Sequence, residues 1–278
     1  MIIMIRGHIR SSFETPYLYN TLKYLSLNND LEIYIHTWDI FQSKISWRNL
    51  EEKNTKVNVD IINNYFKDLI PLIKKIIIEN DKNIVLYGYK EGFIVNAPLI
   101  GWKNMWCGQY NLIQYINNNV TNTNQLVINM RFDLFDNSIV FDFINVLKFI
   151  NNVLYYKNLT NQVLTKNIFI KNNPRCFGID NIYIGNINTM NTLISHFHHN
   201  LDHIINIYFF NKKIKCHEVL VFLENKRIFS TKQLFIPKIK RVYHPSMYEN
   251  NPNVATIVMK NMYSKLVTSS NKQLGEIF

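Results

Sequence analysis

Hydrophobic and polar positions in the first forty residues predict a strand, a helix and a second strand. Residues 1–6 form a short, continuous apolar run, as expected of a strand that is buried on both faces. Pro16 suits the first turn of a helix, whose leucines recur at helical spacing until Asn28. Residues 31–37 alternate as a second strand. This order predicts a parallel sheet with right-handed crossovers.

The same patterns predict further elements along the chain. Apolar spacing favours helices over 65–79, 105–116, 189–205 and 217–225, and strands over 84–87, 126–130 and 182–184, while 140–150 fits either. We therefore expect residues 1–230 to form one α/β domain with a Rossmann-type, mostly parallel sheet flanked by helices. Residues 231–278 are expected to be a basic C-terminal extension packed on the same domain.

Composition narrows the class of protein. Hydrophobic residues make up 47% of the 278 residues and charged residues 18%, which excludes a disordered chain. No apolar run approaches the ~20 residues that cross a bilayer, and Arg6 ends the apolar N-terminus too early for a signal peptide. The three cysteines are far apart and fit neither a disulfide framework nor a zinc knuckle. These features indicate the cytoplasm.

Positive charge is concentrated near the C-terminus. The formal net charge is +11, and residues 203–278 hold 12 lysines and arginines against 4 glutamates. Two interpretations stay open. One is an AT-rich genome, which encodes lysine, asparagine and isoleucine freely; the other is a basic face for phosphate, nucleic acid or a membrane surface.

The loop after the first predicted strand is the first candidate for ligand binding. Arg6, Gly7, His8 and Arg10 follow one another closely there. Glycine lets the backbone approach a ligand, and the planar fork of arginine suits phosphate. In α/β sheets ligands bind beyond the carboxyl ends of strands, so we favour a diphosphate ligand over a solvated basic turn. The chain contains neither a dinucleotide fingerprint nor a P-loop.

Two further groups follow predicted strands. Thr37 and Trp38 end the second strand and Trp47 lies beyond it; a tryptophan there could stack on a base or sugar, or pack in the core. Arg131 and Asp133 follow the strand over 126–130 and point the same way if extended. They could bind ribose, phosphate or a metal, or form a structural ion pair.

Other polar residues allow weaker hypotheses. Asn104 stands at a predicted helix start, where an anion could bind; the alternative, which we favour, is a capped helix that packs its aromatic residues inward. Asp180 precedes a short strand and could be a general base or a turn former. His199 and His203 share a helix face and could bind zinc, but no HExxH glutamate lies between them, so we expect a polar helix face.

Taken in order, these segments resemble bacterial and giant-virus glycosyltransferases of capsule and lipopolysaccharide loci that carry an Arg-x-Asp motif. The resemblance covers about residues 1–225. It rests on six segments: Met4–Arg10, Ile35–Trp38, Asn104 to Gln114, Val127–Leu134, Asp180–Gly185 with Met190, and His217-Glu218.

This resemblance implies a GT-A-like fold and transfer of a sugar from a nucleotide-diphosphate donor to a glycan or lipid-linked acceptor. The donor would be bound by Arg6, Gly7, His8, Arg10, Thr37, Trp38, Asn104, Arg131 and Asp133. Asp180 and Asp133 would be catalytic, Asp133 would hold any Mg²⁺ or Mn²⁺, and Glu218, Lys238 and Arg241 would meet the acceptor. The basic tail allows a peripheral membrane contact.

Two alternatives belong to other classes. The chain could be a catalytically inactive scaffold with a glycosyltransferase-like fold. It could also be a basic nucleic-acid-binding protein, since its pI is about 9.4. No nucleic-acid module is recognisable in the sequence, so we expect no nucleic-acid partner. The sequence leaves the oligomeric state open.

Overall fold

A computed structural model describes residues 1–46, 50–94, 97–136, 141–160, 162–170, 180–214 and 216–229. The chain separates into two compact units, Met1–Ile239 and Lys240–Phe278. The second unit lies outside the described residues, so the predicted C-terminal extension stays a prediction.

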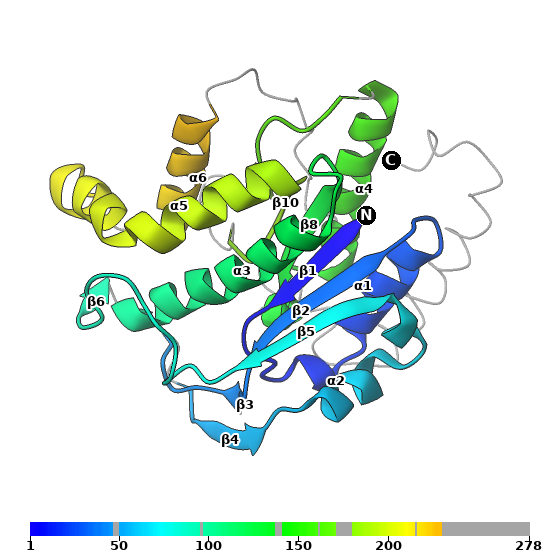
Figure 1. Cartoon of the computed structure of the whole chain (residues 1–278), viewed down its shortest axis with the longest axis horizontal. Coiled ribbons are helices and arrows are strands. Elements are labelled where there is room, and N and C mark those ends of the chain that lie inside the picture. The colour runs from blue at the N-terminus through cyan, green and yellow to red at the C-terminus, as the bar shows by residue number, and fades with distance from the viewer. Residues whose placement is uncertain are drawn as a thin grey trace. The chain divides into compact units, whose positions relative to one another are not determined.

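The first unit is an α/β domain built on a six-stranded sheet of order β5-β2-β1-β8-β10-β9 (Figure 1). The four strands β5, β2, β1 and β8 are parallel, and β10 is antiparallel to both β8 and β9. The strands of this sheet are β1 (Ile2–Arg6), β2 (Glu32–Trp38), β5 (Ile73–Glu79), β8 (Leu126–Arg131), β9 (Ile168–Phe169) and β10 (Ile182–Asn186). Two short hairpins are β3 (Ile40–Gln42) with β4 (Lys53–Lys56), and β6 (Phe93–Ile94) with β7 (Ala97–Pro98).

Helices cover both faces of the sheet, as Figure 1 shows. On one face α3 packs on β1 and β2, while α5 packs on β8, β10 and α3. On the other face α1 contacts α4. The helices are α1 (Tyr17–Ser26), α2 (Val59–Phe66), α3 (Leu99–Asn119), α4 (Phe143–Thr160), α5 (Ile187–Ile205) and α6 (His217–Ile228), with 3₁₀ turns η1 (Ser12–Glu14), η2 (Lys67–Leu72) and η3 (Phe132–Phe135) and a π-turn η4 (Asn206–Asn211).

The core explains the apolar runs in the sequence. All five residues of β1 are buried, as are those of β10. A strand between two helical layers has no solvent-facing side, so it is apolar at every position rather than at alternate ones. The predicted strands over 1–6, 31–37, 126–130 and 182–184 are confirmed, and so are the helices over 105–116, 189–205 and 217–225. Residues 143–150 of the ambiguous segment are helical.

The predicted helix over 65–79 is wrong. Helix α2 ends at Phe66, η2 contains Pro71, and Ile73–Glu79 form strand β5. Pro71 cannot donate a helical hydrogen bond, and the isoleucines after it are β-branched and favour a strand. The spacing of isoleucines in this short segment fits both the helical period and the strand period. The apolar pattern therefore predicted a helix where a strand forms.

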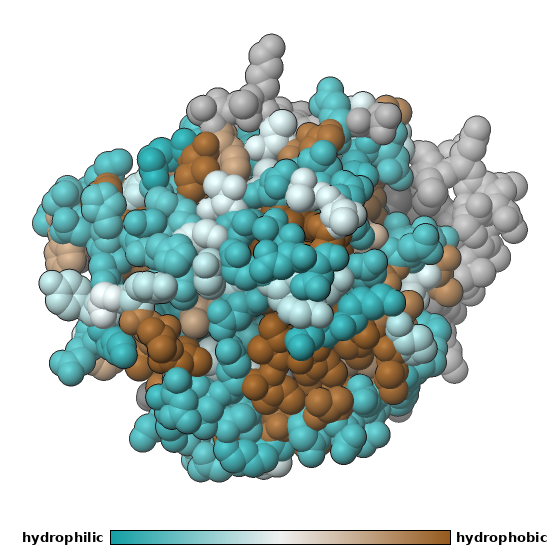
Figure 2. Space-filling model, in the orientation of Figure 1, coloured by the Kyte–Doolittle hydropathy of each residue, from teal (hydrophilic) through white to brown (hydrophobic). Residues whose placement is uncertain are grey.

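Strand β5 is an edge strand, and its isoleucines are only half-buried. Figure 2 shows apolar side chains gathered on the surface along this edge. Lys74, exposed on the same strand, is the kind of residue that discourages pairing with another chain.

The predicted strand over 84–87 is also wrong. These residues form no regular element, and Val85 and Tyr87 are exposed. Leu86 is buried although it belongs to no strand, so its apolar character reflects packing and not sheet pairing.

Candidate functional site

The carboxyl edge of the parallel strands brings the predicted site residues together. Arg6 ends β1 and pairs in register with Arg131, which ends β8, while β2 ends at Trp38. The chain leaves β1 toward β2 on one side, and reaches β8 on the other side only later, by way of α3. The boundary between β1 and β8 is therefore the topological switch point, where α/β sheets bind their ligands.

Asp133 is the centre of the charged groups at this switch point. Arg131 donates to both carboxylate oxygens, from Nε to Oδ1 at 2.6 Å and from Nη2 to Oδ2 at 2.7 Å. Arg10 reaches Oδ2 from the loop after β1. The side chain of Asp133 is only 3% exposed. One arginine from the loop after β1 and one from the end of β8 thus converge on one buried carboxylate.

Electrostatics stabilise the charge of Arg131. Burial alone would lower the pKa of Arg131, but the charges of Asp133 and Asp180 outweigh it and raise that pKa. The nearby Asp136 accepts a hydrogen bond from Ser11 Oγ at 2.7 Å. Its pKa is raised, mainly by burial and further by the charge of Asp133, although the Ser11 bond opposes the shift.

Arg6 lies beneath this cluster rather than at its surface. Its Nε donates to Asn129 Oδ1 at 2.7 Å and its Nη2 to the carbonyl of Asp180. Its side chain is almost fully buried, and that burial lowers its pKa to about 10. Arg6 therefore connects β1 to β8 and holds the backbone at Asp180, just before β10.

Asn129 is a site residue that the sequence analysis missed. Its amide nitrogen donates to Gln109 Oε1 at 3.0 Å and to Tyr183 OH at 2.9 Å, and Tyr183 OH donates to Gln109 at 2.7 Å. This buried network connects α3, β8 and β10 below Arg6. An asparagine inside the apolar strand over 126–130 was the signal that could have revealed it, because buried amides need partners.

The loop after β1 has room around its backbone. Gly7 adopts φ 93°, and among the described residues, apart from Gly7 and its chain neighbours, no atom lies within 4 Å of the place where a Cβ would be. His8 Nε2 is buried without a hydrogen-bond partner among the described residues. Burial, with the charge of Arg10, lowers the pKa of His8 to about 3, so this imidazole is neutral.

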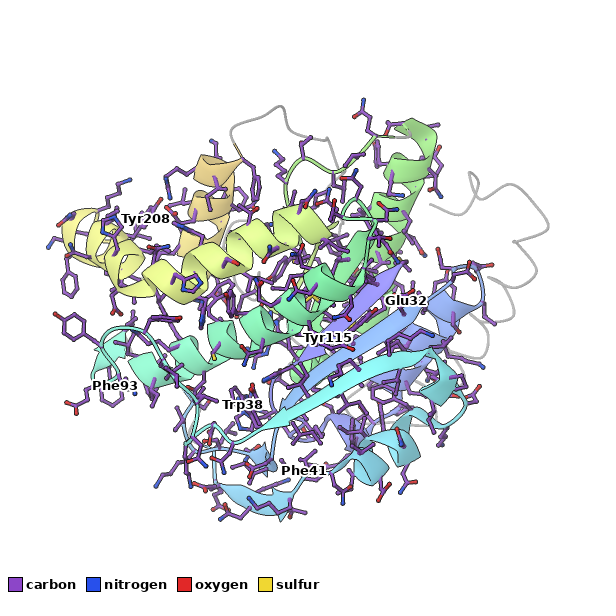
Figure 3. The ribbon with its side chains drawn as sticks, in the orientation of Figure 1. Glu32, Trp38, Phe41, Phe93, Tyr115 and Tyr208 are labelled. Atoms are coloured by element: carbon purple, nitrogen blue, oxygen red, sulfur yellow. The ribbon has the colours of Figure 1, made fainter. Side chains whose placement is uncertain are left out.

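The carboxyl end of β2 is held against the loop after β1. Gly7 N donates to the carbonyl of His36 at 3.1 Å, and Thr37 Oγ1 donates to the carbonyl of Gly7 at 3.0 Å. Trp38 stands at the carboxyl end of β2, opposite Glu32 at the start of the strand (Figure 3). It is buried, with its ring 6.0 Å from that of His8. In this position Trp38 packs rather than offering a face for stacking.

A second polar group that the sequence analysis missed lies beside these loops. His36 Nε2 is 2.7 Å from Glu79 Oε2, and Asn111 Nδ2 of α3 donates to both oxygens of Glu79. The hydrogen bond from His36 is the main reason that the pKa of Glu79 is lowered. The same imidazole lies so close to Gly108 that a Cβ there would be 2.5 Å from it.

Asn104 is not at a helix start. Helix α3 begins at Leu99, so the residue lies in the second turn and the predicted helix N-terminus is misplaced. Pro98, directly before Leu99, marks the true start of α3. The mostly apolar residues between Leu99 and Asn104 concealed this start in the sequence. Asn104 is buried, and its Oδ1 has no partner among the described residues. It stands one turn before Gly108, which packs on His36 at the end of β2.

Asp180 and the start of α6 complete the arrangement. The carboxylate of Asp180 lies 3.9 Å from Arg131 Nη1. His217, at the first position of α6, accepts a hydrogen bond from Trp106 Nε1 at 3.2 Å. Burial lowers the pKa of His217 to about 4, against the opposing charge of Asp180. Glu218 is in the first turn of the same helix.

The remaining predicted residues have other surroundings. Trp47, Lys238 and Arg241 lie outside the described residues. His196 Nε2 contacts Glu224 at 2.6 Å, and His198 stacks on Tyr110. Across the described ranges, no three histidine, cysteine, aspartate or glutamate side chains gather as a metal ion would require. His199 and His203, for which the sequence predicts a polar helix face, are both exposed.

The donor set around Asp133 does not fit a divalent cation. Magnesium prefers near-octahedral oxygen ligands, usually one or two carboxylates with phosphates and water. Both oxygens of Asp133 already accept hydrogen bonds from guanidinium groups. A cation at this carboxylate would stand beside the positive charges of two arginines.

Comparisons of the chain with protein-family models, curated proteins and solved structures found no match. In the part of the chain that the structure describes, no helix combines the length and apolar character that a membrane crossing demands.

Proposed function

We propose that this protein is a glycosyltransferase that moves a sugar from a nucleotide-diphosphate donor to a glycan or lipid-linked acceptor. The observation that carries the proposal is the convergence of Arg10 and Arg131 on Asp133 at the switch point of the sheet. Guanidinium groups at the carboxyl ends of parallel strands form a site suited to a diphosphate. The GT-A-like class belongs to this proposal; the α/β sheet is compatible with it.

In the proposed reaction, the bond between the anomeric carbon and the diphosphate oxygen breaks while an acceptor hydroxyl forms a new bond to that carbon. Negative charge develops on the departing diphosphate, and Arg10 and Arg131 stabilise it. Asp180 takes the proton of the acceptor hydroxyl, since its carboxylate stands beside Arg131. Arg6 positions Asp180 through its backbone carbonyl. Glu218 would meet the acceptor from the start of α6.

The test is binding, followed by turnover, with a panel of donors. Thermal unfolding is measured with UDP, GDP, CDP and dTDP, and release of the nucleoside diphosphate is then measured from the matching nucleotide sugars. A ligand at 100 times its Kd stabilises by about 2.7 kcal/mol, which moves the midpoint visibly. We expect one nucleotide to stabilise the protein and its sugar conjugate to turn over.

Two variants make this test specific. Arg131→Ala should weaken nucleotide binding by about 10- to 100-fold, since hydrogen bonds to charged groups contribute about 1.5–3 kcal/mol. Lys157→Gln is the control. The pKa of the N-terminal amine is lowered mainly by burial and in part by the charge of Lys157, so Lys157 lies near the N-terminus, at the opposite edge of the sheet. Binding without turnover would favour the inactive scaffold. Stabilisation by heparin or DNA alone would favour a nucleic-acid partner.

A further inference from the structure

We propose that this site binds the donor diphosphate with arginine side chains and without a divalent cation, and that Asp133 positions those arginines. The inference rests on the proposed function and names the groups that meet the diphosphate. It replaces the expectation that Asp133 ligates Mg²⁺ or Mn²⁺.

The first support is the geometry at Asp133. The two contacts from Arg131, at 2.6 and 2.7 Å, form a bidentate pair in which both groups are held in one plane. Arg10 adds a third contact on Oδ2. The carboxylate thus fixes the direction of two guanidinium groups, one from the loop after β1 and one from the end of β8.

The second support is the backbone of Arg10. This residue adopts φ 55°, a left-handed conformation that non-glycine residues seldom take. Its N–H donates to the carbonyl of Phe41 at 2.9 Å, beyond the end of β2. Strain of this kind persists where the surroundings hold it, and it concentrates at functional sites. Here it directs the Arg10 side chain toward Asp133.

The third support is that the neighbouring carboxylates, Asp136 and Asp180, have partners of their own. Asp136 accepts from Ser11, and its pKa is raised by burial. Asp180 faces Arg131. Within the described residues these carboxylates do not join Asp133 in a metal-binding group. The positive groups that the contacts place at Asp133 are the guanidinium groups of Arg10 and Arg131.

The ligand would accept hydrogen bonds from the N–H groups of Arg131 that do not donate to Asp133. A guanidinium has five N–H donors, and the bidentate pair uses two of them. Nη1 is 3.9 Å from Asp180, which is longer than a hydrogen bond. The side chain of Arg131 is 20% exposed, in contrast to the buried Asp133.

The experiment measures Kd by calorimetry for UDP, GDP, CDP, dTDP and inorganic pyrophosphate, once with EDTA and once with saturating Mn²⁺. We expect the Kd of the bound nucleotide to agree within about threefold between the two conditions. Tightening of about tenfold or more by Mn²⁺ overturns this inference and leaves the proposed function standing. If no nucleotide or pyrophosphate binds under either condition, both proposals fail.

Variants separate a positioning role of Asp133 from metal ligation. Asp133→Asn should weaken binding by the same factor in EDTA and in Mn²⁺, whereas loss confined to Mn²⁺ identifies a metal ligand and overturns the proposal. Arg10→Lys keeps the charge but loses the planar fork, and should also weaken binding in EDTA. It serves as the second variant if Asp133→Asn does not fold. Lys157→Gln should bind as the unaltered protein does in both conditions.

Discussion

At the scale of single residues, close packing around His36 limits what α3 can carry. Gly108 and Gly101 are both glycines of α3, but their surroundings differ. A Cβ at Gly108 would lie 2.5 Å from the buried His36 ring, whereas one at Gly101 would lie 3.3 Å from Ile45 Cγ2. The first contact needs the ring to move, and the ring is held by Glu79.

We therefore expect Gly108→Ala to destabilise the protein and Gly101→Ala to leave it nearly unchanged. Overpacking costs about 1–3 kcal/mol, while replacing a helical glycine by alanine contributes up to about 1 kcal/mol in the other direction. Urea unfolding measures the unfolding free energy of each variant. Gly101→Ala is the matched control, because it includes the gain from replacing a helical glycine without the close contact with His36. Equal unfolding free energies would show that the His36 ring moves freely.

His217 makes the stability of the protein depend on pH. Its pKa is lowered from 6.5 to about 4, chiefly by burial, with Asp180 opposing the shift and Arg6 and Arg131 adding to it. Below pH 6.5 the unfolded chain binds a proton at this residue that the folded protein resists. The stabilisation is thus complete above pH 6.5 and declines as the pH falls toward 4.

Between pH 7 and 4 we expect His217 to account for a loss of roughly 2–3 kcal/mol, since one pKa unit corresponds to about 1.4 kcal/mol. His217→Gln removes this titration while keeping an acceptor for Trp106. Thermal unfolding from pH 7 to 4 should then show a shallower decline than in the unaltered protein. His8 and His198, whose pKa values are also lowered, maintain the remaining slope. Identical slopes in the two proteins would contradict the assignment.

At the scale of elements, the sequence predicted strands best where both faces are buried. Continuous apolar runs identified β1, β8 and β10, because a strand between two helical layers has a simple pattern. Strand β5 was missed because it lies at the edge, half-buried, with isoleucines whose spacing also fits a helix. Pro71 and the β-branched isoleucines favour a strand locally, and pairing with β2 completes it; that pairing is not encoded in the local sequence.

The start of α5 provides a test of local helix specification. Thr189 N donates to Asn186 Oδ1 at 2.8 Å, and Asn186 N donates to Thr189 Oγ1 at 3.0 Å, so the pair forms a capping box. Asn186 Nδ2 also donates to the carbonyl of Leu164 at 2.7 Å. The residue joins β10 to α5 directly and is buried.

We expect Asn186→Ala to lower the unfolding free energy by about 1–2 kcal/mol, at the upper end for loss of a helix cap. Asn58→Ala is the control, because Asn58 caps α2 through a single exposed bond to Ile61 N. That variant should cost less than Asn186→Ala in the same urea titration. A larger loss for Asn58→Ala would show that the cap of α5 is not important for stability.

At the scale of the whole molecule, the sequence predicted which loops share an edge but not how their side chains pair. Arg10, Arg131 and Asp133 follow strands whose carboxyl ends meet, so their proximity follows from a parallel sheet. The inward turn of Arg6 depends on contacts with β8 and with the backbone before β10, and the central role of Asn129 depends on contacts with α3 and β10. Those contacts join residues far apart in the chain, and no local pattern encodes them.

If the carboxyl edge binds a nucleotide, one ligand should slow exchange in several distant segments together. These segments are the loops after β1 and β2, the second turn of α3, and η3 after β8, since all four meet at that edge. Amide exchange reports local opening, and a bound ligand adds its binding free energy to the openings that release it.

Hydrogen exchange with and without the nucleotide that stabilises the protein measures this directly. We expect slower exchange over residues 7–13, 39–43, 104–108 and 132–136. The loops before β2 and β8, at the opposite edge of the sheet, should exchange at unchanged rates and serve as internal controls. Protection confined to the opposite edge, or to one of the four segments, would place the ligand elsewhere. Protection of all four by one nucleotide would mean that the switch point between β1 and β8 is the binding site.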